Sequence, residues 1–176
     1  MYCVIEKMGK GMVAVLLLLS LSLFGQEQKD TRISQMAEQL NGIWILDTLK
    51  HDSLLKVQYR TKLGVVEETT IDGEVISSVQ KSGFWAMELS FNPWGYGSYN
   101  VIDNYGDTIG DISLLSSLPV PEIVISSGEL YINWTFTYGS DREKIILCNS
   151  NKLILENSKR RRVFTKATSS TTNSHD

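Results

Sequence analysis

The chain has 176 residues, enough for one domain, and a formal net charge of −3 at pH 7. A nucleic-acid-binding protein needs a concentrated basic face, so this charge balance argues against that class. With only two histidines, a histidine-ligated metal site is not expected either.

The N-terminal stretch has the pattern of an export signal. Residues 12–24 are almost entirely apolar, with Lys7 and Lys10 before them and Gly25 after them. A basic start, a short apolar run and a small residue at the boundary are typical of a secretory signal peptide. Such a run rises only about 20 Å as a helix, too short for a comfortable membrane span. We predict a cleaved signal over 1–25 and a periplasmic or secreted protein; the alternative is an uncleaved membrane anchor.

Residues 26–41 predict a short polar lead followed by a helix. The apolar side chains at 33, 36, 37 and 40 recur at helical spacing, and Asn41 with Gly42 is a typical helix end. Two turns of helix are not stable in isolation, so we expect this segment to pack across one end of the domain.

From Gly42 onward the pattern changes to short β-runs separated by turns. Gly42 and Trp44 lie two residues apart and therefore share a face of the first run. Asp72-Gly73 is a strong hairpin signal. The predicted strands are 42–49, 54–61, 64–70, 75–80, 84–91, two short bent strands within 94–111, 122–126, 130–138, 144–148, 152–156 and 160–166.

Strands that follow one another this closely pair antiparallel, in a barrel or a sandwich. We predict an all-β fold, an antiparallel up-and-down β-barrel over 42–166 with a short N-terminal helix. The tail over 167–176 has no apolar residue after Ala167 and is expected to be disordered.

The segment from Leu40 to Trp44, after a short helix, and the late runs 152–156 and 160–165 resemble the lipocalin-like, calycin-type domains of exported bacterial proteins. The resemblance spans roughly 40–166 and implies a β-barrel. It also implies that an arginine from a late segment packs over Trp44. The candidates are Arg160, Arg161 and Arg162, of which Arg161 is chosen, so Gly42, Trp44 and Arg161 are the predicted structural residues.

Two predicted strands carry aromatic and apolar side chains on one face. A barrel of about eight strands is wide enough to be filled by its own side chains or to hold one small ligand. We predict that the barrel binds a small hydrophobic molecule. The alternative is a structural or protein-interaction module of the cell envelope with a filled core. The predicted ligand-binding residues are Trp85, Met87, Phe91, Tyr96, Tyr99, Trp134 and Phe136, with Tyr105 also placed near the mouth.

The remaining reactive groups do not predict an enzyme, a cofactor or a metal. Cys148 lies in an apolar run and is interpreted as a small buried side chain rather than a reactive thiol. A Ser-His-Asp arrangement would depend on His51 alone. Asp103, Asp107 and Asp111 lack the spacing of a calcium loop and are interpreted as turn residues. The basic run 159–162 is interpreted as a turn and a solvated strand face.

Overall fold

The computed structural model describes residues 31–107, 114–116 and 119–168. In these ranges a helix over 31–40 is followed by twelve strands. The strands are β1 (Gly42–His51), β2 (Leu54–Thr61), β3 (Gly64–Ile71), β4 (Glu74–Lys81), β5 (Phe84–Phe91), β6 (Gly97–Tyr105), β7 (Leu114–Ser116), β8 (Val120–Ser126), β9 (Glu129–Phe136), β10 (Gly139–Cys148), β11 (Lys152–Glu156) and β12 (Arg160–Lys166). The predicted antiparallel β class with a short N-terminal helix is confirmed. The predicted signal over 1–25, the lead up to residue 30, and residues 169–176 of the predicted tail lie outside the described residues.

Within the described residues, no helix combines the length and the apolar character that crossing a membrane requires.

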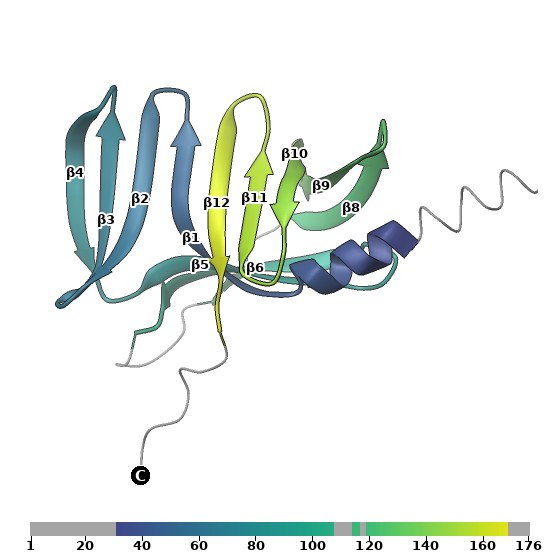
Figure 1. Cartoon of the computed structure of the whole chain (residues 1–176), viewed down its shortest axis with the longest axis horizontal. Helices are drawn as coiled ribbons and strands as arrows, with labels where there is room; N and C mark the ends of the chain where they lie inside the picture. The colour runs from purple at the N-terminus through teal and green to yellow at the C-terminus, as the bar shows by residue number, and fades with distance from the viewer. Residues whose placement is uncertain (1–30, 108–113, 117–118, 169–176) are drawn as a thin grey trace, which may run out of the picture.

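β1 is the strand at which the sheet branches. Its residues Gly42–Ile45 pair with β5, its residues Thr48–His51 pair with β2, and β12 pairs along the opposite edge. One arm continues from β2 to β3 and β4, and the other runs from β12 through β11, β10 and β9 to β8. Figure 1 shows these two arms upright, with β5 and β6 crossing at their base. β1 is thus the strand that connects the two arms with the β5–β6 pair.

Gln58 occupies the point where β2 and β5 separate from β1. Its side chain is only 5 % exposed. Its amide donates to the Leu46 carbonyl at 3.5 Å and its Oε1 accepts from the Trp85 backbone N–H at 2.7 Å. Buried backbone groups need partners, and here a side chain supplies the partners that a continuous ladder would otherwise provide.

A β-bulge in β1 decides which side chains share a face beyond the branch. The register with β12 shifts between Leu46 and Thr48, so β1 contains one extra residue there. As a result Leu46 and Leu49, three residues apart, both lie on the face of Phe164 and Arg162, which are their partners in β12.

The helix and Trp44 close the base of the core. Ile33, Ala37 and Leu40 of the helix are buried in the same apolar cluster as Trp44, which is fully buried. The indole N–H of Trp44 donates to the Leu40 carbonyl at 2.6 Å. Trp44 is therefore buried against the helix.

The cation over Trp44 is a lysine, and the predicted arginine is elsewhere. Lys166 Nζ lies 4.9 Å from the centroid of the Trp44 indole, because Lys166 is the partner of Trp44 in the β1–β12 register. Arg161 instead forms an exposed ion pair with Glu156, with 2.8 Å between Nη1 and Oε2. A side chain from the end of β12 reaches the base of the core, whereas Arg161 pairs with Lys50, at the opposite end of β1 from Trp44.

The sheet does not close into a continuous barrel. β8 ends the long arm, and the segment before β6 meets it through an isolated bridge between Tyr96 and Glu122. The Ile123 N–H also donates to the Gly95 carbonyl at 2.8 Å. Gly95 permits this approach because its φ is +89° and a Cβ there would lie 2.8 Å from Ile33 Cγ2. The structure thus establishes an antiparallel sheet in which β8 meets the segment between β5 and β6 at one bridge.

Two predicted boundaries in the second half of the chain were wrong. The described part of 94–111 contains β6 alone, and the next strand, β7, follows at Leu114–Ser116. β10 begins at Gly139 rather than at residue 144, because Phe136 pairs directly with Gly139 across a two-residue turn. This shift brings Asp141 and Glu143 into the sheet.

Replacing Gly42 by Val is expected to destabilise the fold. Gly42 has a φ of +125°, a conformation that side-chain-bearing residues rarely adopt, and a Cβ there would lie 3.1 Å from Lys166 Cε. The branched side chain would displace the lysine that covers Trp44. Thermal unfolding should show a loss of stability larger than that of Gly128→Val, because Gly128 also has a positive φ, of +80°, but no neighbour within 4 Å. Equal melting temperatures for the two variants would contradict the steric part of this argument.

Candidate functional site

An open cavity of about 540 Å³ lies where β1, β2 and β12 face β5. We call it the cleft. Its apolar wall consists of Leu46, Leu49, Leu54 and the half-buried Trp85. The charged and polar side chains of the cleft are His51, Lys56, Glu67, Lys81, Arg160 and Arg162.

One end of the cleft carries two lysines that share one carboxylate. Lys56 Nζ lies 3.0 Å from Glu67 Oε1, and Lys81 Nζ lies 2.7 Å from Glu67 Oε2. Burial raises the pKa of Glu67, but the hydrogen bonds and charges of Lys81 and Lys56 together lower it by more. The pKa therefore lies below its ordinary value. The carboxylate stays ionised, and this end retains an excess of one positive charge.

The other end of the cleft is formed by two arginines that hold a buried glutamate. Glu143 is fully buried. Its Oε1 accepts from Arg160 Nε at 2.8 Å and from Arg162 Nε at 3.0 Å, and its Oε2 accepts from Arg162 Nη2 and, at 2.7 Å, from the indole of Trp134. Arg160 also pairs with Asp141 at 2.6 Å. These bonds satisfy the carboxylate of Glu143 completely. The charges of Arg160 and Arg162 are balanced by those of Glu143 and Asp141.

The same cluster determines the ionisation of its members. Burial raises the pKa of the Glu143 carboxyl, but the charges and hydrogen bonds of Arg162 and Arg160 outweigh it, so the pKa lies below its ordinary value. Burial also raises the pKa of the nearby Tyr99 phenol. Glu143 is therefore a carboxylate, and Tyr99 is a neutral phenol, at neutral pH.

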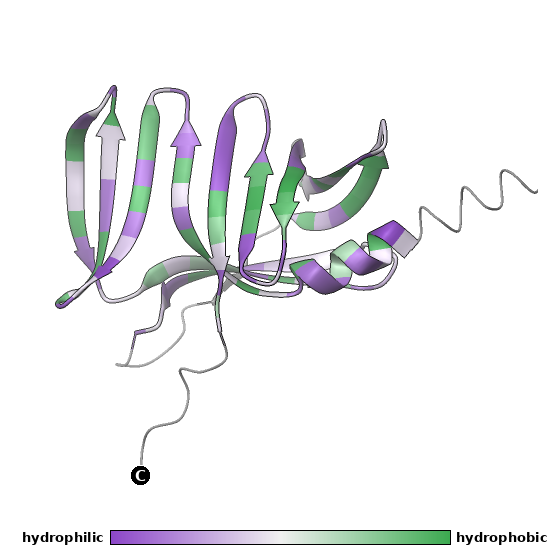
Figure 2. Ribbon diagram, in the orientation of Figure 1, coloured by the Kyte–Doolittle hydropathy of each residue, from purple (hydrophilic) through white to green (hydrophobic). Residues whose placement is uncertain are grey.

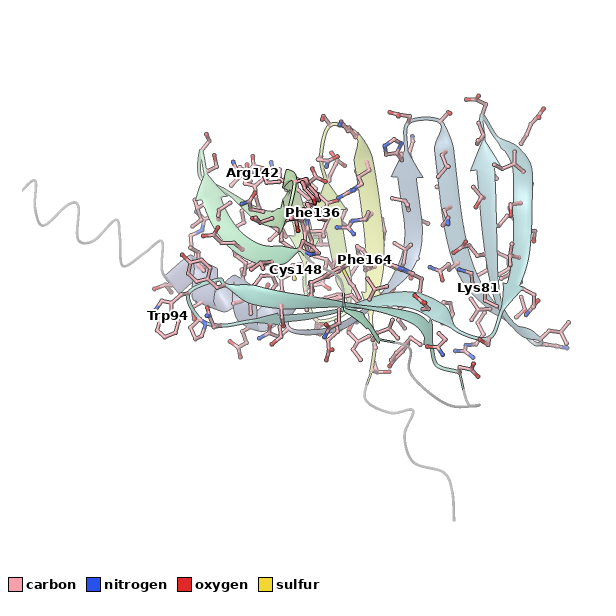
Figure 3. The ribbon with its side chains drawn as sticks, turned by 180° about the vertical axis from the view of Figure 1, so that it is seen from behind. Lys81, Trp94, Phe136, Arg142, Cys148 and Phe164 are labelled. Carbon is pink, nitrogen blue, oxygen red and sulfur yellow. The ribbon has the colours of Figure 1, made fainter. Side chains whose placement is uncertain are left out.

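A second cavity of about 250 Å³ adjoins the cleft on the far side of the arginines. It is lined by Tyr99, Val101, Pro119, Trp134 and Phe136, and it shares Arg160 and Arg162 with the cleft. The Tyr99 ring meets the Trp134 ring edge-on with centroids 5.3 Å apart. Arg162 Cζ lies 5.4 Å from the Trp134 centroid and 5.4 Å from the Phe164 centroid. In Figure 3 Phe136 and Lys81 lie toward opposite ends of the sheet, with Phe164 between them.

The structure divides the predicted ligand-binding residues into four groups. Trp85 lines the cleft, and Tyr99, Trp134 and Phe136 line the second cavity. Met87 and Phe91 are 0 % and 6 % exposed and belong to the core beneath the helix. Tyr96 is 56 % exposed at the bridge to Glu122, away from both cavities. Tyr105 pairs with Phe84 at the far end of β6 and lines neither cavity.

The charged residues of the site were missed by sequence reasoning. In β2 the apolar residues Leu55 and Tyr59 alternate with Lys56, yet the apolar face is the outer one, 37 % and 43 % exposed. The run of alternating Arg160, Arg162 and Phe164 on one face of the last strand was the available signal. The common partner of the two arginines, Glu143, lies just before the strand predicted to begin at residue 144 and so was not considered.

The other candidate groups from the sequence are Cys148, His51 and the aspartates considered as calcium ligands. Burial raises the pKa of the free thiol of Cys148 to about 11, so this thiol is protonated at neutral pH. His51 Nδ1 lies 3.3 Å from Asp52 Oδ2, and both side chains are substantially exposed. In the described ranges no three His, Cys, Asp or Glu side chains gather as metal ligands would. Asp111, one member of the alternative calcium set, lies outside those ranges.

Comparison of the chain with protein-family models, with curated proteins and with solved structures finds no match.

Proposed function

We propose that this chain binds a small amphiphile, an apolar body with an acidic group, in the cleft, without catalysis. The observation that carries the proposal is the composition of one cavity: leucine and tryptophan walls with two lysines at its end. An apolar wall with a few placed polar groups is the usual construction of a small-molecule site.

The charges of the cleft favour an anionic rather than a cationic group. Lys56 and Lys81 share the single carboxylate of Glu67, and each ammonium has three donors. A carboxylate or sulfonate can therefore join them without displacing Glu67. At the opposite end the arginines are balanced by Glu143 and Asp141, so we assign the acidic group to the lysine end.

The proposal includes the finer fold and the location. A lipocalin-like barrel is supported by the ring of strands β5, β1, β12, β11, β10, β9 and β8, whose ends approach at the bridge between Tyr96 and Glu122. Export is supported by the basic and apolar pattern of residues 1–25, so the ligand would be met in the periplasm or outside the cell.

The test compares two probes that share one ring system. Anilinonaphthalene sulfonate and its uncharged parent, phenyl-naphthylamine, should both fluoresce in the cleft, and the sulfonate should bind more tightly. Leu54→Glu places a charge on the half-buried apolar wall and should weaken both probes. Binding of neither probe to the parent protein would refute the proposal.

Lys56→Met tests the contribution of the ammonium charge to affinity separately from that of the apolar wall. This substitution keeps most of the stem and removes the ammonium, so sulfonate affinity should fall by roughly three- to tenfold while that for the uncharged parent is unchanged. Lys159→Met, at an exposed turn, is the matched control and should change neither affinity. Equal losses for both probes would show that Lys56 acts through packing and not through charge.

A further inference from the structure

β4 is an edge strand with one partner. It pairs with β3 and, among the described residues, has no neighbour on its other side. Figure 1 shows it at the outer end of the arm formed by β2, β3 and β4. An open edge presents unpaired backbone N–H and C=O groups, which is a template for another strand.

The exposed side chains of β4 are unusually apolar for a free edge. Val75 and Ile76 are each 58 % exposed, and Val79 is 46 % exposed. Neither proline nor glycine interrupts the strand, and its charged residues, Glu74 and Lys81, stand at its two ends. Figure 2 shows the hydrophobic segments along β4. A strand of this kind, left open, is well suited to pair with a second strand.

A bulge makes the strand complementary to itself. Residues that oppose each other across a ladder share a face, and the register of β4 with β3 shifts at Ile76. Without the shift Glu74 and Lys81, seven residues apart, would lie on opposite faces. With it, both oppose the alternate β3 residues Ile71 and Val65 and so share one face.

Because Glu74 and Lys81 share a face, β4 can pair symmetrically with β4 of a second copy. A two-fold axis through an antiparallel edge preserves the faces of both sheets, so each residue must meet one of its own face. If Ser78 meets Ser78 of a second copy, Ser77 meets Val79. The bulged pair Val75 and Ile76 then meets Gln80, and Glu74 meets Lys81. Opposite charges thus face each other at both ends of the paired strands.

We propose that β4 pairs antiparallel with β4 of a second copy of this chain, on a two-fold axis at Ser78. The continuous sheet then satisfies the backbone groups of both edges and places Val75, Ile76 and Val79 beside side chains of the second copy. Lys81 has donors left beyond its 2.7 Å bond to Glu67, so it can also meet Glu74 of the second copy. The proposal does not rest on ligand binding in the cleft, although the two proposals share Lys81.

Cross-linking tests the axis directly. We would introduce Ser78→Cys in the full chain with Cys3 and Cys148 changed to Ser, and treat it with a short bismaleimide. Opposed residues of paired strands have Cβ atoms about 5 Å apart, so covalent dimers should form rapidly. Ser158→Cys, at an exposed turn away from β4, is the matched control and should form no covalent dimer. Equal cross-linking of both variants, or none, would overturn the proposal.

Sedimentation equilibrium of the full chain tests the energetics. Ser78→Lys would place two lysines directly opposite each other and should raise the dimer dissociation constant by roughly tenfold or more. Glu74→Lys, which opposes Lys81 of the second copy, should also weaken it, whereas Ser158→Lys should not. Circular dichroism and thermal unfolding confirm that each variant is folded. A monomeric parent chain, or association that Ser78→Lys and Glu74→Lys leave unchanged, would overturn the proposal.

Discussion

Trp44→Ala should lower the free energy of unfolding by about 3–5 kcal/mol, the usual cost of truncating a buried aromatic side chain. Trp44 is fully buried, its indole N–H is bonded to the Leu40 carbonyl at 2.6 Å, and Lys166 lies over its ring. The truncation opens a cavity where the helix, β1 and β12 meet. Since domains are commonly stable by only about 5–15 kcal/mol, the variant should be close to unfolded or should melt far below the parent.

Trp94→Ala is the matched control for this prediction. Trp94 is 74 % exposed and lies beside the helix, as Figure 3 shows, so its truncation should cost well under about 1 kcal/mol. Chemical and thermal unfolding of the two variants, monitored by circular dichroism, measures both effects. Similar losses for Trp44→Ala and Trp94→Ala would mean that β1 is not the centre of the fold.

Glu143→Gln should cost about 3 kcal/mol or more, because it removes the charge that compensates two largely buried guanidinium groups. Arg162 has only 12 % of its side chain exposed and Arg160 30 %, and both donate to the carboxylate. Breaking a buried pair leaves the remaining charges uncompensated, which is why its loss costs far more than the loss of a surface pair. Glu156→Gln removes the exposed partner of Arg161 and should cost less than about 1 kcal/mol.

The effect of Glu143→Gln should depend on pH. The pKa of Glu143 is lower in the folded chain than its ordinary value of 4.5, since Arg162 and Arg160 outweigh the effect of burial. A group of this kind stabilises the fold above its unfolded pKa, and that contribution is lost as the pH falls through the folded pKa. The gap in unfolding free energy between parent and variant should thus be full at neutral pH and shrink below about pH 4.5. A gap that stays constant down to pH 3 would contradict the ionic origin of the effect.

Most of the strands followed from local pattern because their side chains alternate and their turns are distinctive. The predicted bounds of β2, β5, β11 and β12 match those observed. At the turn after β3, Asp72 and Gly73 have φ values of 51° and 86°, as a tight hairpin turn requires. The pattern also predicts that Trp44 is buried, against the helix or the last strand, and the structure places it against the helix with Lys166 of the last strand over its ring.

The alternation of apolar and polar residues did not predict features that depend on how two strands pair. Which face of β2 points inward depends on its register with β1 and β3. The apolar side chains of Leu55 and Tyr59 suggested the wrong inner face, so the cleft residue Lys56 was missed. The branch of β1 is held by Gln58, a residue with no local signal for that role.

The cleft itself is a product of the folded chain. Glu143 lies in β10 and its two arginines lie in β12, separated by β11, and the pairing of these strands alone brings the three side chains together. Lys56 and Lys81 come from β2 and β4 and meet on Glu67 of β3 for the same reason. Alternation along a strand is local and can be found in the sequence. The register between strands is set by bulges, turns and burial acting over the whole sheet, and it determined which charges meet.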